Sequence, residues 1–177
     1  VYDGTNIATA SLTNNKISGD ELIVNKTGAT FNNKNIGVGK AVIVSGITIT
    51  GTDAGNYTLT SATATGTASI TVKSLTISAT ASDKVYDANK TANVNLSSNK
   101  LGSDVVTITK TLAEFDTKNI GTGKTVNVTG ITISGTDAGN YTLTSSTASG
   151  TASITAKLLT ITGSIPDRMY DLSLIHI

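Results

Sequence analysis

Residues 40–59 read KAVIVSGITITGTDAGNYTL, and this stretch decides the fold class. Val42 and Val44 share one parity along the chain, whereas the two isoleucines that follow Gly46 share the other. Strict alternation of apolar side chains indicates a β-strand with one buried face, and a shift of one residue moves those side chains to the opposite face. We therefore expect a strand that bulges, bends or turns at Gly46.

The same pattern returns 84 residues later, because the chain consists of an internal repeat. Residues 1–84 align with residues 85–168 without a gap, and 48 of the 84 positions are identical. Gly130 falls at the same break in the alternation, and Ile43 becomes Asn127, which indicates an outward-facing position. A repeat of this length exceeds the roughly 20–45 residues of a solenoid unit and suits a domain that folds alone.

The other alternating segments also predict strands, and no segment has the period of about 3.6 residues that an amphipathic helix requires. Thr, Val and Ile favour strands, whereas the helix formers Glu, Gln and Arg are nearly absent. The sequence thus predicts an all-β fold of tandem small β-sandwich domains, immunoglobulin-like or β-grasp-like. The further strands are expected over residues 20–26, 56–61, 67–73, 74–79 and 104–110. The expected core includes Val42, Val44, Leu59, Ile70, Val126, Val128, Leu143 and Ile154, with Ile43 and Asn127 exposed.

The composition excludes several classes of function. The chain has no Cys and one His, so it offers no disulfide framework, zinc cluster or Ser/His/Asp triad. Thirteen basic and twelve acidic residues leave a net charge of +1, which does not suggest nucleic-acid binding. The apolar runs are too short to cross a bilayer, so we expect no direct membrane insertion. The sequence predicts a protein that is not an enzyme and uses no cofactor or metal.

The run TDAGNYTL at residues 52–59 recurs unchanged at residues 136–143. It is similar to the Asp-x-Gly-x-Tyr signature that precedes the sixth strand of immunoglobulin domains, where the tyrosine hydroxyl bonds to the backbone at a corner of the sandwich. We therefore expect a structural role for the motif rather than a catalytic one. Its residues are Asp53, Gly55 and Tyr57 in the first copy and Asp137, Gly139 and Tyr141 in the second.

Asp53 and Asp137 allow two interpretations. Either aspartate could ligate calcium, or each could cap an Asx-turn, and the turn is the simpler explanation because it needs no ion.

Residues 121–125, GTGKT, resemble the end of a nucleotide-binding P-loop. The full motif requires a glycine where Lys118 stands. An alternating strand follows, not a helix whose N-terminus could hold phosphate. We interpret the run as a Gly-rich hairpin turn.

Three motifs follow one another in a fixed order: Val1-Tyr2-Asp3-Gly4, then FNNKNIGVGK at residues 31–40, then TDAGNYTL. Together they resemble the YDG repeats of large bacterial surface proteins, which often lie downstream of a filamentous-haemagglutinin-type secretion domain. The resemblance covers residues 1–171. It implies an exported stalk or adhesive segment at the surface of a Gram-negative bacterium, and it supplies no catalytic residues.

The second copy of the first motif reads Tyr86-Asp87-Ala88. Ala88 stands where the first copy has Gly4, so the turn there either does not need glycine or has a different conformation.

The units are best divided before the strand that contains Leu75, because Lys73-Ser74 joins one strand directly to the next. This division gives a first repeat, 1–73, that lacks its opening strand, a complete repeat, 74–157, and the first strand of a third, 158–171. The absence of a flexible linker predicts a stiff string of domains. The final residues, 172–177, depart in style and resemble a translated sequencing adapter, so we expect them, with His176, not to belong to the natural protein.

Two functional hypotheses follow. The first is a structural spacer whose partners are neighbouring repeats in the same chain, and the alternative is a weak binding module for host glycan or matrix protein. A binding module should gather aromatic or charged side chains on one exposed face, but the few aromatics here mostly recur in both copies, which favours the spacer. The first repeat should also expose an unpaired edge, with which residues 158–162 of another molecule could pair.

Overall fold

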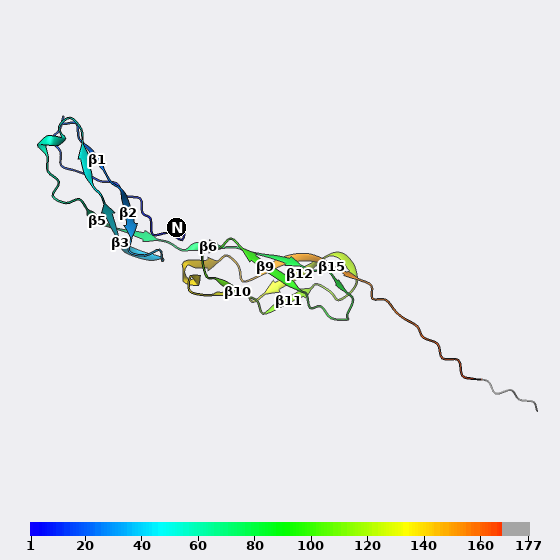
Figure 1. The fold of residues 1–177 in the computed structure, drawn as a ribbon. Helices are drawn as coiled ribbons and strands as arrows, with labels where there is room; N and C mark the ends of the chain where they lie inside the picture. The colour runs from blue at the N-terminus through cyan, green and yellow to red at the C-terminus, as the bar shows by residue number, and fades with distance from the viewer. Residues whose placement is uncertain (168–177) are drawn as a thin grey trace, which may run out of the picture.

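The computed structural model describes residues 1–167, and these form two elongated β-sheet bodies in a row (Figure 1). The N-terminal body contains β1–β5, which pair only with one another, and the C-terminal body contains β6–β15, which do the same. The fold is all-β, as predicted, and the described helical segments are two single 3₁₀ turns, η1 (Ala54–Asn56) and η2 (Ala138–Asn140).

The N-terminal body has a three-stranded and a two-stranded sheet. Strand β3 pairs with β2 and β5, and β4 pairs with β1. The bounds are β1 (Ile23–Asn25), β2 (Gly28–Phe31), β3 (Gly37–Ser45), β4 (Thr48–Thr50) and β5 (Ala64–Ile70).

The predicted break at Gly46 is where the chain leaves one sheet for the other. Gly46 has a φ of +63°, which L-residues rarely adopt, and a Cβ there would lie 2.2 Å from Oγ1 of Thr27. The glycine therefore allows β3 to end and β4 to begin with the opposite face inward. Gly130 has the same role in the second copy, with a φ of +65°.

The C-terminal body adds a layer that the N-terminal body does not have. Its main sheet has the order β11-β12-β15-β8, and β7, paired with β9, packs against β15. A core of apolar side chains from β7 and β9 on one side and from the main sheet on the other fills the space between them. The bounds are β6 (Lys73–Leu75), β7 (Ile77–Ala81), β8 (Lys84–Val85), β9 (Val94–Ser98), β10 (Thr107–Thr109), β11 (Leu112–Phe115), β12 (Gly121–Thr129), β13 (Thr132–Ser134), β14 (Tyr141–Leu143) and β15 (Ala148–Thr155).

The core agrees with most of the prediction. Ile43 and Asn127 are exposed, as expected. Leu143 is half-buried, and Leu59 was predicted wrongly because it is 38% exposed. The expected residues that are buried are Val42, Val44, Ile70, Val126, Val128 and Ile154.

The exposure of Leu59 has a physical cause in strand pairing. In the C-terminal body Leu143 lies in β14, which pairs in parallel with β6. The N-terminal body contains no counterpart of β6, and residues 57–59 accordingly form no strand. The local sequence is the same in both copies, so the difference comes from the pairing partner.

The interpretation of residues 121–125 as a hairpin turn is wrong. They begin β12, and the register of β12 on β15 shifts between Gly121 and Lys124, which is a β-bulge. Gly123 in the bulge has a φ of +60°. Lys124 Nζ folds back to Asp116 Oδ1 at 2.8 Å.

Beyond β15 the described chain continues without further strands as a tail (Figure 1). The apolar side chains of the tail are almost fully exposed: Leu158 by 93%, Leu159 by 86%, Ile161 by 86% and Ile165 by 93%. Residues 172–177, expected to be foreign to the protein, lie outside the described residues, as do residues 168–171. No helix within residues 1–167 has the length and apolar character needed to span a membrane.

Candidate functional site at the junction of the two bodies

The most elaborate cluster of side chains in the protein lies where the two bodies meet. Tyr2 of the N-terminal body is 1% exposed and packs edge-on against Tyr141 of the C-terminal body, with ring centroids 5.6 Å apart. The backbone N–H of Tyr2 donates to the carbonyl oxygen of Thr71 at 2.8 Å, which fixes the start of the chain beside the end of β5. Such an edge-to-face pair adds about 0.5–1.5 kcal/mol to the stabilisation from burial.

Asp104 lies at the centre of this cluster and is 3% exposed. Its Oδ1 accepts hydrogen bonds from the hydroxyl of Tyr2 at 3.0 Å and from Nζ of Lys34 at 2.8 Å, so both bonds cross the junction. Its Oδ2 accepts a hydrogen bond of 2.6 Å from the hydroxyl of Tyr141 within its own body. One carboxylate therefore ties two tyrosines and a lysine together.

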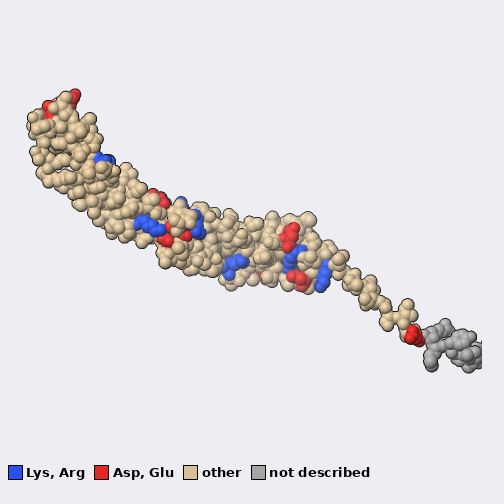
Figure 2. Space-filling model, viewed as in Figure 1, with Lys and Arg blue, Asp and Glu red and all other residues tan. Residues whose placement is uncertain are grey.

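Lys34 contacts a second carboxylate across the junction. Its Nζ lies 2.8 Å from Oδ1 of Asp137 as well as 2.8 Å from Oδ1 of Asp104, and 5.8 Å from the ring centroid of Tyr2. Oδ2 of Asp137 accepts the backbone N–H of Val105 at 2.9 Å. Figure 2 shows the basic and acidic atoms gathered where the two bodies meet.

Asn140 forms a third link between the bodies and is 4% exposed. Its side-chain oxygen accepts the backbone N–H of Ile36 at 3.0 Å, and its side-chain nitrogen donates to Oδ1 of Asn35 at 3.1 Å. Both polar ends of the amide thus have a partner in the N-terminal body. Such paired polar contacts fix the angle and register of an interface, because any other arrangement leaves buried groups unsatisfied.

Apolar side chains surround the polar cluster. Tyr2 and Ile70 of the N-terminal body form one continuous core cluster with Leu75, Val106 and Tyr141 of the C-terminal body. The two bodies therefore share a core at the junction and do not meet only through surface charges. A shared apolar core with directional bonds inside it predicts that the two bodies move as one unit.

The contacts within the cluster favour the ionised form of both carboxylates and the protonated form of Lys34. Burial alone would raise the pKa of Asp104, but the hydrogen bonds from Lys34, Tyr141 and Tyr2 outweigh it and hold that pKa below its usual value. The hydrogen bond from Lys34 likewise lowers the pKa of Asp137, and the two carboxylates raise the pKa of Lys34. Burial, followed by the bond to Asp104, raises the pKa of Tyr141 to about 12.

The two aspartates each accept a backbone N–H from a residue that is distant in the sequence. Neither Asp53 nor Asp137 makes a side-chain capping bond to the 3₁₀ turn that follows it, so the Asx-turn interpretation is wrong. Asp53 instead accepts the backbone N–H of Glu21 at 2.9 Å, as Asp137 does that of Val105. Within residues 1–167 no three acidic or histidine side chains are grouped as a metal site would require.

The hydroxyl of Tyr141 also accepts the backbone N–H of Leu101 at 3.0 Å, and that of Tyr57 accepts the N–H of Ile17 at 2.9 Å. The bond from the tyrosine hydroxyl to the backbone of its own copy, which the likeness to the immunoglobulin signature implies, is therefore present in both copies. The contact joins residues 40 positions apart, whereas the corner of immunoglobulin domains joins residues a few positions apart.

The Tyr-Asp motifs form matching turns. Oδ1 of Asp3 accepts the N–H of Thr5 at 2.8 Å, and Oδ1 of Asp87 accepts the N–H of Asn89 at 3.1 Å. Ala88 has a φ of +70°, close to the +82° of Gly4, so the second copy makes the same turn with a residue that disfavours it.

Gly55 and Gly139 do not have a demanding backbone conformation, and a Cβ at either would meet open space. The glycines that the local fold requires are Gly51 and Gly135, with φ values of +125° and +117°. A Cβ at Gly135 would lie 2.3 Å from the carbonyl oxygen of Val105. Sequence reasoning did not select these two residues, although both recur in the repeat.

Asp104, Lys34 and Asn140 were also not selected as site residues. The sequence did contain a signal, because each of the three has an identical residue at the equivalent position of the other copy. These residues are, in the same order, Asp20, Lys118 and Asn56. Polar residues that recur in both copies of a repeat, at positions the core does not explain, could have indicated an interface between copies.

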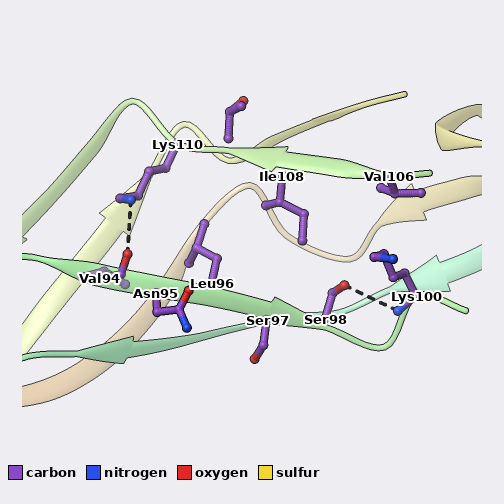
Figure 3. A pocket seen from close by; sticks show the side chains of 10 residues that line it. Val94, Asn95, Leu96, Ser97, Ser98, Lys100, Val106, Ile108 and Lys110 are labelled. Carbon is purple, nitrogen blue, oxygen red and sulfur yellow. Dashed lines mark hydrogen bonds between the residues drawn. The ribbon is translucent and has the colours of Figure 1, made fainter. Parts of the chain in front are cut away.

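A hollow of about 660 Å³ lies elsewhere, between β9 and β10 (Figure 3). Its lining is mainly aliphatic and hydroxyl-bearing, and none of the lining residues is aromatic or acidic. Lys110, at its edge, donates to the carbonyl oxygen of Val94 at 3.3 Å. The hollow therefore lacks the aromatic faces and convergent polar groups of a typical small-ligand pocket.

Comparison with known proteins places these features in a family. The profile described as the YDG domain matches residues 1–65 and residues 71–149. The chain belongs to the YDG-domain family. The two matches correspond to the two repeat copies, and the junction described above therefore joins two successive YDG repeats. No curated protein and no solved structure matches the chain.

Proposed function

We propose that the chain is part of the stalk of an exported bacterial adhesin of the filamentous-haemagglutinin type, in which tandem YDG repeats extend an adhesive region from the surface of a Gram-negative cell. The observation that supports this role best is the junction. Tyr2, Lys34 and Asn140 all bond across it, and a spacer needs such a fixed connection between consecutive units.

The proposal includes the division into units and their architecture. The units are 1–73, 74–157 and 158–171, and each complete unit is a small β-sandwich. The pairing of β6 with β14 and of β7 with β9 supports this division, because it associates residues 73–81 with the second copy. The apolar core between the β7–β9 layer and the main sheet supports a sandwich.

Weak binding of host glycan or matrix protein is the second candidate function. The hollow beside β9 could receive a ligand, but it lacks aromatic side chains, so the spacer remains the better supported role. No catalytic activity is part of either proposal.

The two functions can be separated in the parent adhesin. We would delete the YDG repeats and then replace them with an unrelated rigid spacer of equal length, and we would measure adhesion of the cells each time. A spacer predicts that adhesion falls on deletion and returns with the replacement. Adhesion that stays low with the replacement, together with saturable binding of the isolated repeats to a glycan or matrix array, would instead support the binding module.

A further inference from the structure

The two outer ends of this chain carry the two halves of the junction that joins its repeats. One half, which we call the donor face, consists of Tyr2, Lys34 and Asn35 and recurs as Tyr86, Lys118 and Asn119 in the C-terminal body. The other half, the acceptor face, consists of Asp104, Asp137, Asn140 and Tyr141 and recurs as Asp20, Asp53, Asn56 and Tyr57 in the N-terminal body.

The acceptor face of the N-terminal body is already assembled. The hydroxyl of Tyr57 donates to Oδ2 of Asp20 and accepts the N–H of Ile17, as that of Tyr141 donates to Oδ2 of Asp104 and accepts the N–H of Leu101. Figure 2 shows acidic atoms exposed at the outer tip of this body.

The open positions of this face are the ones that the junction fills. At the junction, Oδ1 of Asp104 and Oδ1 of Asp137 hold the ammonium group of Lys34. Asp20 and Asp53 present the same pair of carboxylates, and neither forms a salt bridge with a described residue. Asn56, the counterpart of the buried Asn140, is exposed.

The donor face of the C-terminal body has the matching geometry. The backbone N–H of Tyr86 donates to the carbonyl oxygen of Thr155 at 2.9 Å, as that of Tyr2 does to Thr71 at 2.8 Å. The side chains of Lys118 and Asn119 are exposed. The backbone of Tyr86 is therefore fixed as that of Tyr2 is, and the side chain of Lys118 is exposed to a partner.

A groove in the N-terminal body provides an independent indication. A hollow of about 350 Å³ runs between residues 9–13 and residues 64–68, with Val42 and Val44 beneath it. In the C-terminal body the corresponding space is filled by β7, which pairs with β9 and contacts β15.

Two equivalent glycines, Gly150 and Gly66, show that β7 covers this position in the C-terminal body and that no described residue covers it in the N-terminal body. A Cβ at Gly150 would lie 2.8 Å from the carbonyl oxygen of Ala79 in β7, whereas a Cβ at Gly66, its counterpart, would meet nothing within 4 Å. Residues 10–14 correspond to β9 but form no strand. The N-terminal body thus has an open place for one β-strand.

The tail of the same chain has the sequence of the end of β6 and of the first residue of β7. Leu159 corresponds to Leu75 in β6, which pairs with β14, and Ile161 corresponds to Ile77, where β7 begins. Leu159-Thr-Ile161 repeats Leu75-Thr-Ile77, of which Leu75 is fully buried, whereas Leu159 and Ile161 are each 86% exposed. Because the tail follows the donor face along the chain, a docking that repeats the internal junction would also carry the tail to the groove.

We infer that the acceptor face and groove of the N-terminal body bind the donor face and tail of a second copy of this chain, so that molecules associate end to end. The contact is heterologous, because different surfaces meet, and it leaves one face open at each end. Association can therefore continue beyond a dimer into filaments. The tail pairs with residues 57–59 and 10–14, the counterparts of the segments that pair with β6 and β7, and this backbone pairing supplements the side-chain contacts.

Sedimentation of the full chain over a dilution series tests this inference. We expect a mass that rises above the 18.0 kDa of one chain as the concentration increases, without a plateau at a dimer. A chain that stays at the mass of a monomer at every concentration would overturn the inference.

Two variants of the tail make the test specific. Leu159→Asp should weaken association about tenfold or more, because the counterpart Leu75 is buried. Leu158→Asp is the matched control: its counterpart Ser74 is exposed, so association should change by less than about twofold. Equal effects of both variants would show that the apolar tail adheres non-specifically and would contradict the strand insertion.

The polar faces are tested by charge reversal and by cross-linking. Lys118→Glu should weaken association, whereas Lys26→Glu, at an exposed lysine outside both faces, should not. The chain has no cysteine, so Asn56→Cys combined with Asn119→Cys gives two unique thiols. A short bis-maleimide should join these into a ladder of products, and replacing Asn119→Cys by Asn127→Cys should abolish the ladder. A ladder with both pairs, or with neither, would contradict the proposed register.

Discussion

The hydroxyl of Tyr2 donates a hydrogen bond of 3.0 Å to Oδ1 of Asp104, although the two residues lie 102 positions apart and belong to different repeats. The tyrosine of the YDG motif therefore does not serve only its own repeat. It enters the core that it shares with the next repeat, where Tyr141 and Lys34 bond to the same carboxylate. The motif is part of the connection between units.

Tyr2→Phe should weaken the junction by about 0.5–1.5 kcal/mol, because it removes one hydrogen bond and keeps the buried ring. Tyr86→Phe is the matched control, since Tyr86 has the same repeat position but lies at the outer end of the chain. Calorimetry at a concentration where the chain is monomeric checks the prediction. Tyr2→Phe should separate the unfolding of the two bodies into distinct transitions. Equal behaviour of the two variants would show that the bond does not couple the repeats.

Gly135→Ala should destabilise the C-terminal body, whereas Gly139→Ala should not. The φ of +117° at Gly135 is strained for alanine, and its Cβ would lie 2.3 Å from a backbone oxygen, which cannot move away easily. The strain alone costs about 1–3 kcal/mol. At Gly139 a Cβ meets open space. Chemical denaturation of both variants measures the difference, and similar stabilities would contradict this account of the motif.

The features that depend only on residues close together along the chain were predictable from the sequence. The alternation of side chains predicted that Val126 and Val128 are buried and Asn127 exposed. The shift in this alternation predicted a bulge, bend or turn at Gly130, and the structure shows that the chain changes sheet there. These features follow from the two-residue period of a strand, and predicting them does not require knowing which strand pairs with it. Leu59 was predicted wrongly for the opposite reason, since its burial depends on a strand that this body does not contain.

The junction could not be derived from local pattern. Asp104 bonds to residues 37 and 102 positions away, and nothing in the sequence around it indicates which groups it meets. The internal repeat shows that Asp104 has a counterpart in Asp20. The repeat does not show whether the groups that bond to this carboxylate lie in the same copy or in the next one. Only the arrangement of the two bodies shows this.

Ala88→Gly should stabilise the C-terminal body. Ala88 has a φ of +70°. The left-handed conformation costs an alanine about 1–2 kcal/mol, and glycine relieves this cost at an entropic penalty of about 0.5–1 kcal/mol. We expect a net gain of about 0.5–1 kcal/mol, visible as a higher melting temperature. The reverse change, Gly4→Ala, should destabilise, because its Cβ would also lie 3.0 Å from Cδ1 of Leu101. A loss of stability in Ala88→Gly would contradict the assigned conformation.

The junction should be most stable over a broad neutral range of pH. The folded-state pKa values of Asp104 and Asp137 lie below the ordinary 3.8, so their contribution is present above about pH 4 and is lost as the pH falls through the folded values. The pKa of Tyr141 is raised from 10.0 to about 12, so its contribution is complete below about pH 10 and is lost as the pH rises from there to about 12. The raised pKa of Lys34 acts in the same direction as that of Tyr141.

Absorbance of ionised tyrosine measures the alkaline limit directly. Five tyrosines contribute, and Tyr141 should titrate late, near pH 12, together with a loss of coupling between the bodies. Tyr141→Phe should remove this late step, whereas Tyr86→Phe should retain it because Tyr86 is not in the junction. A titration in which Tyr141→Phe removes a step near pH 10 would show that the hydroxyl is neither buried nor bonded to Asp104. The pH dependence of the junction would then have to come from Lys34, the two aspartates and Tyr2, whose pKa burial also raises.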